Sequence, residues 1–282
     1  MAVTEEPPRS AEARAAAELA LVRVIHQYGG TPSFVLLGGL VPALLCAGAP
    51  WRHAGTTDVD VQVDLEIAAG SHDAPRLERA LRAAGFAPTE DKAWRWVTST
   101  AGGTKAEVKF ELLADLDDQP SGVSVVFDGC EHLGAANLRG TGYAARDVVL
   151  RDLIADDDGV IRQAQVAMSG LAGFLLAKLA AAAGRRKPKD WYDIAFVLLH
   201  NDAGGVEVAA RLVTDKFPTA ADGEARTWLL DVQASFTDSS AQGTAAYVEQ
   251  MLLDHPDQDP AQLPGDAQLA ISECCRLLRP RS

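Results

Sequence analysis

Two aspartates with one residue between them stand in TDVDVQVDL (57–65) and could share a divalent cation. Asp58 and Asp60 alternate with valines, which is the period-two pattern of a strand that buries one face. Their carboxylates then project from the same face, about 6.5 Å apart along the strand. Like charges on one face repel each other, and a bound cation would cancel that repulsion. The alternative is a strand whose acidic face, extended by Asp64, is simply exposed to solvent. Because the DxD pattern is short, a metal site there needs further residues to support it.

Two glycines precede this stretch. Gly38 and Gly39 end the short apolar run SFVLLGG (33–39), and LVPALLCAG (40–48) follows as a predicted helix. Glycines at a strand-to-helix turn let backbone N–H groups approach a triphosphate, and the helix N-terminus favours negative charge. An ordinary turn is the alternative. No GxxxxGK[ST] sequence is present, which excludes a P-loop ATPase. GTGYAA (140–145) matches GxGxxA, but we expect no strand before it and therefore no dinucleotide site.

A third carboxylate is required if the site runs two-metal phosphoryl transfer, because one metal must activate the attacking hydroxyl. KAEVKFELL (105–113) is predicted to be a strand with Glu107 and Glu111 on one face, beside two lysines. Glu111 is the first choice because it lies deeper in the apolar run. Glu107 and Asp115 remain competitors, and a solvent-facing Glu/Lys stripe on a hairpin is the alternative.

Basic residues gather in the second half of the chain. Lys178, within GFLLAKLAAAAG (173–184), lies on the apolar side of a predicted helix, so it either snorkels to water or reaches a phosphate. The next loop carries the one concentrated group of cations, Arg185, Arg186, Lys187 and Lys189. We expect Asp190 to cap the following helix and Asp193 to lie one turn in. A surface loop with a capping residue would give the same sequence.

Hydrophobic periodicity and end signals predict the elements that must position these residues. Before residue 169 we predict helices over 10–28, 40–48 and 73–84, strands over 33–39, 57–65 and 123–127, and hairpins over 93–113 and 148–166. Ser10 and Gly29 are the expected ends of the first helix. Beyond 169 strand signals nearly vanish, and six helices are predicted within 170–184, 190–201, 206–217, 225–236, 244–253 and 267–278.

This order predicts an α+β fold with a mixed sheet flanked by helices over 10–168 and an all-helical domain over 169–282. Residues 1–9 are expected to be a disordered lead-in. No apolar run approaches the ~18 residues of a membrane span, and the N-terminus lacks a signal-peptide layout, so we expect a cytoplasmic protein. Four scattered cysteines form neither a disulfide framework nor a CxxC site. A net charge of −13 argues against general coating of nucleic acid but not against a local basic site.

Taken together, these motifs resemble a known family. GG (38–39), RHAGTTDVDVQVD (52–64) and KFELL (109–113) resemble the nucleotidyltransferase superfamily of the DNA polymerase β type. LAGFLLAKLAAAAGRRKPKDWYDIAFVL (171–198) is similar to the K…R-x-K-x-KD-x-x-D motif of the AbiEii-type toxins of abortive-infection and toxin–antitoxin systems, which include the MenT-type enzymes. The matching segments span about 35–200. One departure is the gap of 18 residues between GG and DxD, which is longer than the superfamily's usual gap.

The resemblance implies a nucleotidyltransferase-like sheet and assigns roles by position. Asp58, Asp60 and Glu111 would hold Mg²⁺. The triphosphate would be lined by Gly38, Gly39 and Thr57, with Arg52 touching phosphate. Lys178 would neutralise phosphate charge as pyrophosphate leaves. Asp193 would orient Lys178 or assist the acceptor hydroxyl.

The resemblance further implies a Mg²⁺-dependent toxin that transfers NMP from an NTP to an RNA 3′ hydroxyl, at the tRNA acceptor end, and so blocks translation. The loop Arg185–Lys189 would face the RNA, and a cognate antitoxin would be encoded alongside. Two alternatives stay open. The acceptor could instead be a small molecule such as an aminoglycoside, which suits an acidic protein better than RNA does, or a protein hydroxyl. The chain could also be a non-catalytic binding module that keeps the fold.

Overall fold

The structure, a computed structural model, describes residues 9–63, 73–99, 107–220 and 222–279. The predicted lead-in up to residue 8, Asp64, and the hairpin loop 101–104 lie outside the described residues. The chain divides into two compact units. The sheet unit comprises Met1–Leu40, Ala54–Leu138 and Leu150–Met168, and the helical unit comprises Val41–His53, Arg139–Val149 and Ser169–Ser282.

Helix α1 (Ala11–Tyr28) begins and ends where the sequence predicts. The Ser10 side chain accepts a hydrogen bond from the Ala13 N–H at 3.1 Å, which satisfies one of the donors exposed at a helix start. Gly29 ends the helix in the left-handed conformation, with φ of 76°. Helix α4 (Asp73–Ala83) packs against α1, and α1 in turn lies on strands β2 and β5 of the sheet.

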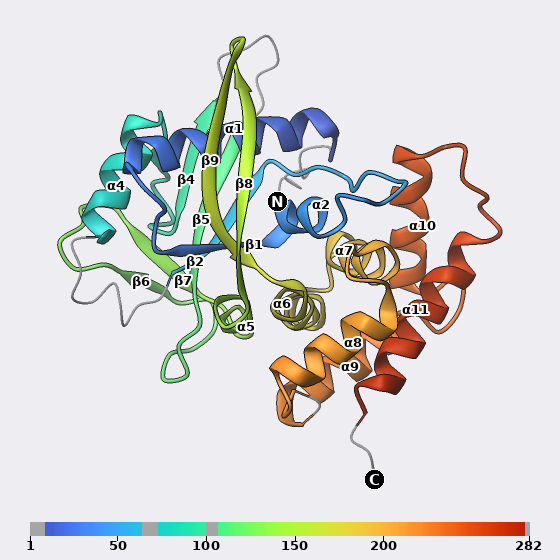
Figure 1. The fold of residues 1–282 in the computed structure, drawn as a ribbon. Helices are drawn as coiled ribbons and strands as arrows, with labels where there is room; N and C mark the ends of the chain where they lie inside the picture. Colours follow the sequence, from blue (N-terminus) through green and yellow to red (C-terminus); the bar gives the residue numbers. More distant parts are fainter. Residues whose placement is uncertain (1–8, 64–72, 100–106, 221, 280–282) are drawn as a thin grey trace. The chain divides into compact units, whose positions relative to one another are not determined.

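The sheet unit is built on a mixed sheet, which confirms the predicted fold class (Figure 1). Its strands are β1 (Phe34–Leu37), β2 (Asp58–Val63), β3 (Ala87–Pro88), β4 (Arg95–Ser99), β5 (Glu107–Ala114), β6 (Ser124–Val126), β7 (Gly134–Asn137), β8 (Val148–Asp157) and β9 (Val160–Ser169). The main order is β3-β4-β5-β2-β1-β9-β8, while β6 pairs with β7 and β7 with β5. Strand β2 is therefore central, antiparallel to β1 and parallel to β5.

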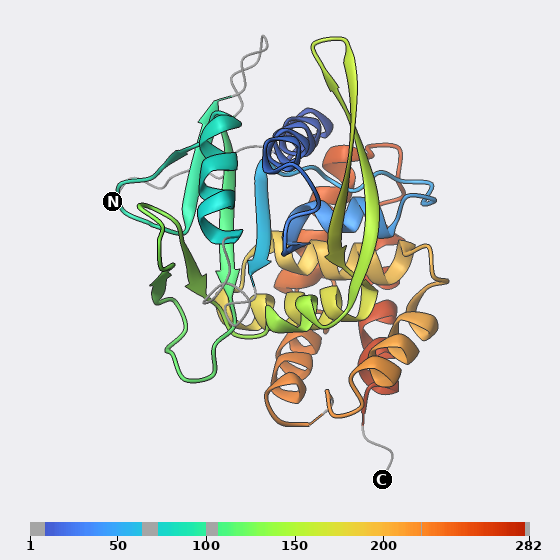
Figure 2. The ribbon, with the colours of Figure 1, turned by 60° about the vertical axis from the view of Figure 1, so that its left-hand side comes forward.

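Two strand pairs confirm the predicted hairpins. β4 and β5 are antiparallel, and β8 and β9 lie side by side in the sheet on either side of a turn at Asp158 and Gly159. Both turn residues have positive φ, 53° and 86°, which is the conformation that short hairpin loops need. The tip of the β8–β9 hairpin projects beyond the other strands of the sheet (Figures 1 and 2).

The helical unit contains every helix predicted beyond residue 169. These are α6 (Leu171–Arg185), α7 (Pro188–His200), α8 (Val206–Lys216), α9 (Gly223–Ala234), α10 (Gln242–Asp254) and α11 (Leu263–Leu277), joined by the short α2 (Val41–Leu45) and α5 (Gly142–Ala145). Helix α6 contacts α5, α7, α8 and α9, and α7 contacts α10 and α11 as well. These two helices form the centre of the unit. None of the described helices is both long enough and apolar enough to span a membrane.

The predicted boundary near residue 168 coincides with the start of the longest segment of the helical unit, at Ser169. The helical unit also takes in Val41–His53 and Arg139–Val149, which lie inside the range predicted for the first domain. Whether 10–168 and 169–282 are domains in the sense of independently folding parts stays a prediction.

Two local predictions were wrong, and one predicted helix is shorter than expected. GTGYAA is preceded by a strand, β7, and its last four residues form α5. The need for glycine there is explained by packing, because a Cβ on Gly140 would lie 2.4 Å from the Cβ of Ala180. Asp190 is not the cap of its helix, since α7 begins at Pro188 after Lys187. The predicted helix over 40–48 is a 3-10 turn, η1 (Gly38–Leu40), followed by only one helical turn in α2.

Candidate active site

The acidic face of β2 has the predicted alternation. Asp58 and Asp60 are half-buried, whereas the side chains of Val59 and Val61 are fully buried on the opposite face. Asp60 pairs in register with Glu111 on the parallel strand β5. Residues paired in this way project to the same side of a sheet, so Glu111 shares the face of the two aspartates. The register thus places Glu111, rather than Glu107, opposite Asp60.

Cations from neighbouring strands partly offset this negative charge. The Lys109 amine lies 3.8 Å from Asp58 Oδ1, and the Arg95 guanidinium lies 2.6 Å from Glu111 Oε1. Arg95 is the register partner of Glu111 on β4, so it completes the row that starts at Asp60. Sequence analysis missed Arg95. The available signal was the hairpin itself, because a hairpin places residues of its two strands opposite each other.

Because Gly38 has no side chain, the carboxylate of Asp60 can occupy the space next to it. Its φ is 76°, and a Cβ built on it would lie 2.0 Å from Asp60 Oδ2. Gly39 has a different neighbour, because a Cβ there would lie 3.0 Å from Cγ2 of Thr56. The Thr56 hydroxyl in turn accepts a hydrogen bond from the Asp58 N–H at 3.0 Å. The turn after β1 therefore fits closely around the start of β2.

The donor set on this face suits a hard cation. Carboxylate oxygens are the ligands that Mg²⁺ prefers, and Mg²⁺ is usually held by one or two carboxylates together with substrate phosphates and water. Within the described part of the chain, no three acidic, His or Cys side chains converge into a complete metal site. Asp58 and Asp60 fit the partial set that a metal–triphosphate complex needs. The hydroxyl of Thr57, next to them, is buried and has no hydrogen-bond partner among the described residues.

The other predicted cluster lies wholly in the helical unit. The Lys178 amine is 3.0 Å from Asp190 Oδ1 and 2.7 Å from Asp193 Oδ2. Lys178 is only 5% exposed and both aspartates are fully buried. Arg185 adds a two-point contact to Asp190, with Nε 2.7 Å from Oδ2 and Nη2 2.8 Å from Oδ1. His53, which sequence analysis did not single out, places Nε2 2.9 Å from Asp193 Oδ1.

These contacts favour the charged forms of Lys178 and Asp190. Burial opposes the charged form of Lys178, but attraction to Asp193 and Asp190 outweighs burial and raises the pKa of the amine. Burial also opposes the charged form of Asp190, and the contacts with Lys178 and Arg185 outweigh it and lower the pKa of that carboxyl. An ammonium has three N–H donors. Within the described chain this amine contacts the two carboxylates, which can accept two of its three N–H donors.

The predicted RNA-facing loop is partly neutralised by the protein itself. Arg185 contacts Asp190, and Arg186 is exposed but lies 2.6 Å from Asp231. Lys187 and Lys189 are half-buried. Arg52 is exposed, and its carbonyl oxygen lies 2.8 Å from His255 Nε2.

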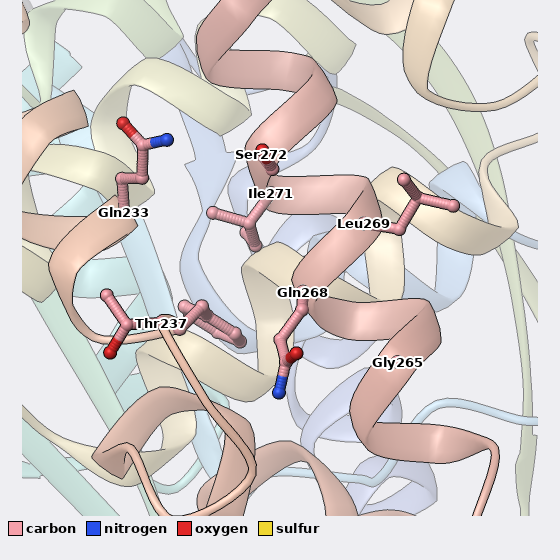
Figure 3. A pocket seen from close by; sticks show the side chains of 8 residues that line it. Gln233, Thr237, Gly265, Gln268, Leu269, Ile271 and Ser272 are labelled. Atoms are coloured by element: carbon pink, nitrogen blue, oxygen red, sulfur yellow. The ribbon is translucent and has the colours of Figure 1, made fainter.

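A separate pocket of about 410 Å³ lies between helices α9 and α11 of the helical unit (Figure 3). It is lined by Gln233, Phe236, Thr237, Gly265, Gln268, Leu269, Ile271 and Ser272. No side chain in this lining is charged, and none belongs to the predicted site. The pocket is therefore poorly suited to a triphosphate, which needs positive charge around it.

The sequence matches the family described as "Nucleotidyl transferase AbiEii toxin, Type IV TA system" over residues 19–268. Among solved structures, the fold is similar to that of an antigenic nucleotidyltransferase-like protein from Paracoccidioides brasiliensis, with a TM-score of 0.40 and 14% sequence identity. That alignment covers 92% of this chain and 95% of the other. No curated protein sequence gives a significant match.

The two glycines are expected to differ in their tolerance of a methyl group. Gly38→Ala forces a positive φ on alanine and a clash with Asp60, so we expect the free energy of unfolding to fall by roughly 1–3 kcal/mol. Gly39→Ala meets only a threonine side chain that can shift, and should lose less than about 1 kcal/mol. Urea denaturation of both variants measures the difference. Equal losses would contradict the close fit at Gly38.

The Lys178 cluster predicts a pH-dependent contribution to stability. The pKa of Asp190 is lowered in the folded protein, so its contribution is present above the unfolded pKa of about 4 and is lost as pH falls through the folded value. Asp190→Asn should cost about 3 kcal/mol at neutral pH, and the difference from wild type should shrink at lower pH. Urea denaturation between pH 3 and 7 measures this difference. Asp231→Asn, which breaks an exposed pair, is the matched control and should lose less than about 1 kcal/mol.

Proposed function

The chain belongs to the AbiEii family of nucleotidyltransferase toxins of type IV toxin–antitoxin systems, and from this premise we propose that it transfers NMP from an NTP to the 3′ hydroxyl of an RNA. The proposed acceptor is the 3′ end of tRNA, the proposed metal is Mg²⁺, and the proposed location is the cytoplasm. Transfer would block translation. The observation that carries this proposal is the row on the half-buried face of β2, where Asp60 lies opposite Glu111 and against Gly38.

The reaction is an in-line displacement. The acceptor hydroxyl oxygen forms a bond to the α-phosphorus of the NTP, the bond from that phosphorus to the bridging oxygen breaks, and pyrophosphate leaves with the electron pair. A bound divalent cation neutralises triphosphate charge and lowers the pKa of the attacking hydroxyl. Asp58 and Asp60 would hold the metal–triphosphate complex, and Glu111, which contacts Arg95, is the proposed third carboxylate. Positioning of the two reactants accounts for much of the rate.

The remaining predicted residues have the following roles in this proposal. Gly38, Gly39 and Thr57 approach the triphosphate, and the exposed Arg52 contacts one of its phosphates. Lys178 uses its remaining N–H donor on a phosphate oxygen, while Asp193 keeps the amine in place. A cognate antitoxin, which the type IV toxin–antitoxin family implies, restrains the activity.

The RNA contact is proposed to fall mainly on the lysines of the loop after α6. Arg185 and Arg186 each contact a protein carboxylate, and Lys187 and Lys189 are the half-buried lysines of the same loop that would contact RNA phosphates. Phosphate contacts of this kind position a nucleic acid without reading its sequence.

A cationic small molecule is a second candidate acceptor. The net charge of −13 and the neutralisation of two loop arginines both favour a positively charged substrate over a polyanion. An aminoglycoside-like molecule carries hydroxyl groups that could attack the same α-phosphorus. This candidate keeps the metal and the NTP and changes only the acceptor.

The decisive experiment is incubation with total tRNA, Mg²⁺ and each α-³²P-labelled NTP. We expect label in the tRNA band from wild type and a loss of at least about 100-fold with Asp60→Asn, because the metal–triphosphate complex loses a carboxylate. Asp152→Asn, a change at an exposed aspartate of β8, is the matched control and should label normally. Label on an added aminoglycoside but not on tRNA would favour the second candidate. Equal label from wild type and Asp60→Asn would place the active site elsewhere.

The loop lysines should affect RNA affinity and leave NTP affinity unchanged. Replacing both Lys187 and Lys189 by alanine is expected to weaken tRNA binding and to reduce the slope of log K against log salt by about 1 for each lost phosphate contact. Filter binding over a series of salt concentrations measures both quantities. Alanine at Arg211 and Arg226, two exposed cations on α8 and α9, is the control. An unchanged slope in the lysine variant would show that the loop does not contact RNA.

A further inference from the structure

The long gap between GG and DxD has a structural explanation. Most of it is Val41–His53, which belongs to the helical unit. The middle of this segment is fixed by Asp202, whose carboxylate accepts hydrogen bonds from the N–H groups of Ala47 and Gly48 at 3.0 and 2.9 Å. The segment therefore delivers its last residue, His53, to a fixed place beside α7.

His53 is enclosed on several sides. It is 4% exposed, and its ring centroid lies 5.0 Å from those of both Tyr192 and Phe196. Its Nε2 lies 2.9 Å from Asp193 Oδ1. Asp193 also contacts the Lys178 amine, which favours the ionised carboxylate. An ionised carboxylate only accepts hydrogen bonds, so His53 Nε2 carries a hydrogen and donates the hydrogen bond to Asp193.

The two carboxylates around Lys178 are each held by a second partner. Arg185 fixes both oxygens of Asp190. His53 fixes Oδ1 of Asp193, which leaves Oδ2 directed to the amine at 2.7 Å. Lys178 and Arg185 carry the positive charges that face the two aspartates, and His53 adds a hydrogen bond to Asp193.

We propose that His53 is a positioning residue for NTP binding: it holds Asp193 in the orientation that fixes the Lys178 amine. This inference rests on the proposed function, in which Lys178 contacts a phosphate of the NTP. Without the hydrogen bond from His53, the Asp193 carboxylate loses the contact that fixes its Oδ1 atom. The amine then loses one of its two fixed contacts, and its remaining donor is no longer pre-oriented for a phosphate oxygen.

Two variants separate the contribution of the His53 hydrogen bond from that of the packing of its ring. His53→Phe keeps an aromatic ring between Tyr192 and Phe196 but removes the donor, whereas His53→Gln keeps a donor near the position of Nε2. Isothermal titration calorimetry with each NTP and Mg²⁺ measures affinity, and thermal unfolding shows whether the variants fold. We expect His53→Phe to weaken NTP binding by about tenfold, as for loss of a hydrogen bond to a charged group. His53→Gln should stay within about threefold of wild type.

A double-mutant cycle shows whether His53 acts through Asp193. In an Asp193→Asn background, His53→Phe should cause no further loss of NTP affinity, because the carboxylate that it orients is already gone. An equal loss in both backgrounds would overturn the inference. If His53→Phe does not fold, His53→Asn replaces it, because its shorter amide does not reach Asp193 and should weaken binding like the phenylalanine.

The remaining outcomes distinguish this inference from the proposed function. If wild type binds an NTP and His53→Phe binds it equally well, the role of His53 is overturned while the proposed function stands. If wild type binds no NTP in the presence of Mg²⁺, the proposed function fails, and this inference fails with it.

Discussion

The sheet unit depends on one constraint, the placement of two carboxylates on the half-buried face of its central strand. Strand β2 has β1 on one side and β5 on the other, so Asp58 and Asp60 lie inside the sheet and not at its edge. Like charges on such a face repel, and their surroundings must compensate. Lys109 on β5 lies near Asp58 and supplies part of that compensation, while Arg95 on β4 compensates the charge of Glu111. The turn after β1 must contain glycine at position 38, because Asp60 occupies the space of a side chain.

Much of the fold could be predicted because its signals are local. The alternation in β2, the Ser10 cap of α1 and the periodicity of the six long helices all lie within short windows of sequence. Strand β7 could not be predicted, because Gly134–Asn137 is short and made mostly of small residues, and its pairing with β5 is a tertiary contact. Asp190 has the residue type of an N-cap, but Pro188 is favoured at the first helical position, and the buried contact with Lys178 decides the role of the aspartate.

In the candidate site, too, the residues within short motifs could be predicted from the sequence, and those brought together only by the fold could not. The DxD pair, the two glycines and the positions of Lys178 and Asp193 are visible in the sequence because each motif is compact. The sequence analysis expected Lys178 to reach water or a phosphate, and the structure instead shows a contact with Asp190, only 12 residues away. His53 could not be found in this way, because 140 residues separate it from Asp193. Only the folded helical unit brings these two residues together.

The charges of the chain also limit what its basic loop can do. Arg185 and Arg186 are counted among the cations of that loop, yet each contacts an aspartate of the protein, so they contribute little attraction toward a distant polyanion. The net charge of −13 adds a general repulsion that salt would screen. An RNA acceptor would therefore be held by a few local contacts and released easily after transfer. Such weak binding suits an enzyme that must modify many acceptor molecules, and it does not suit a protein that stores or coats RNA.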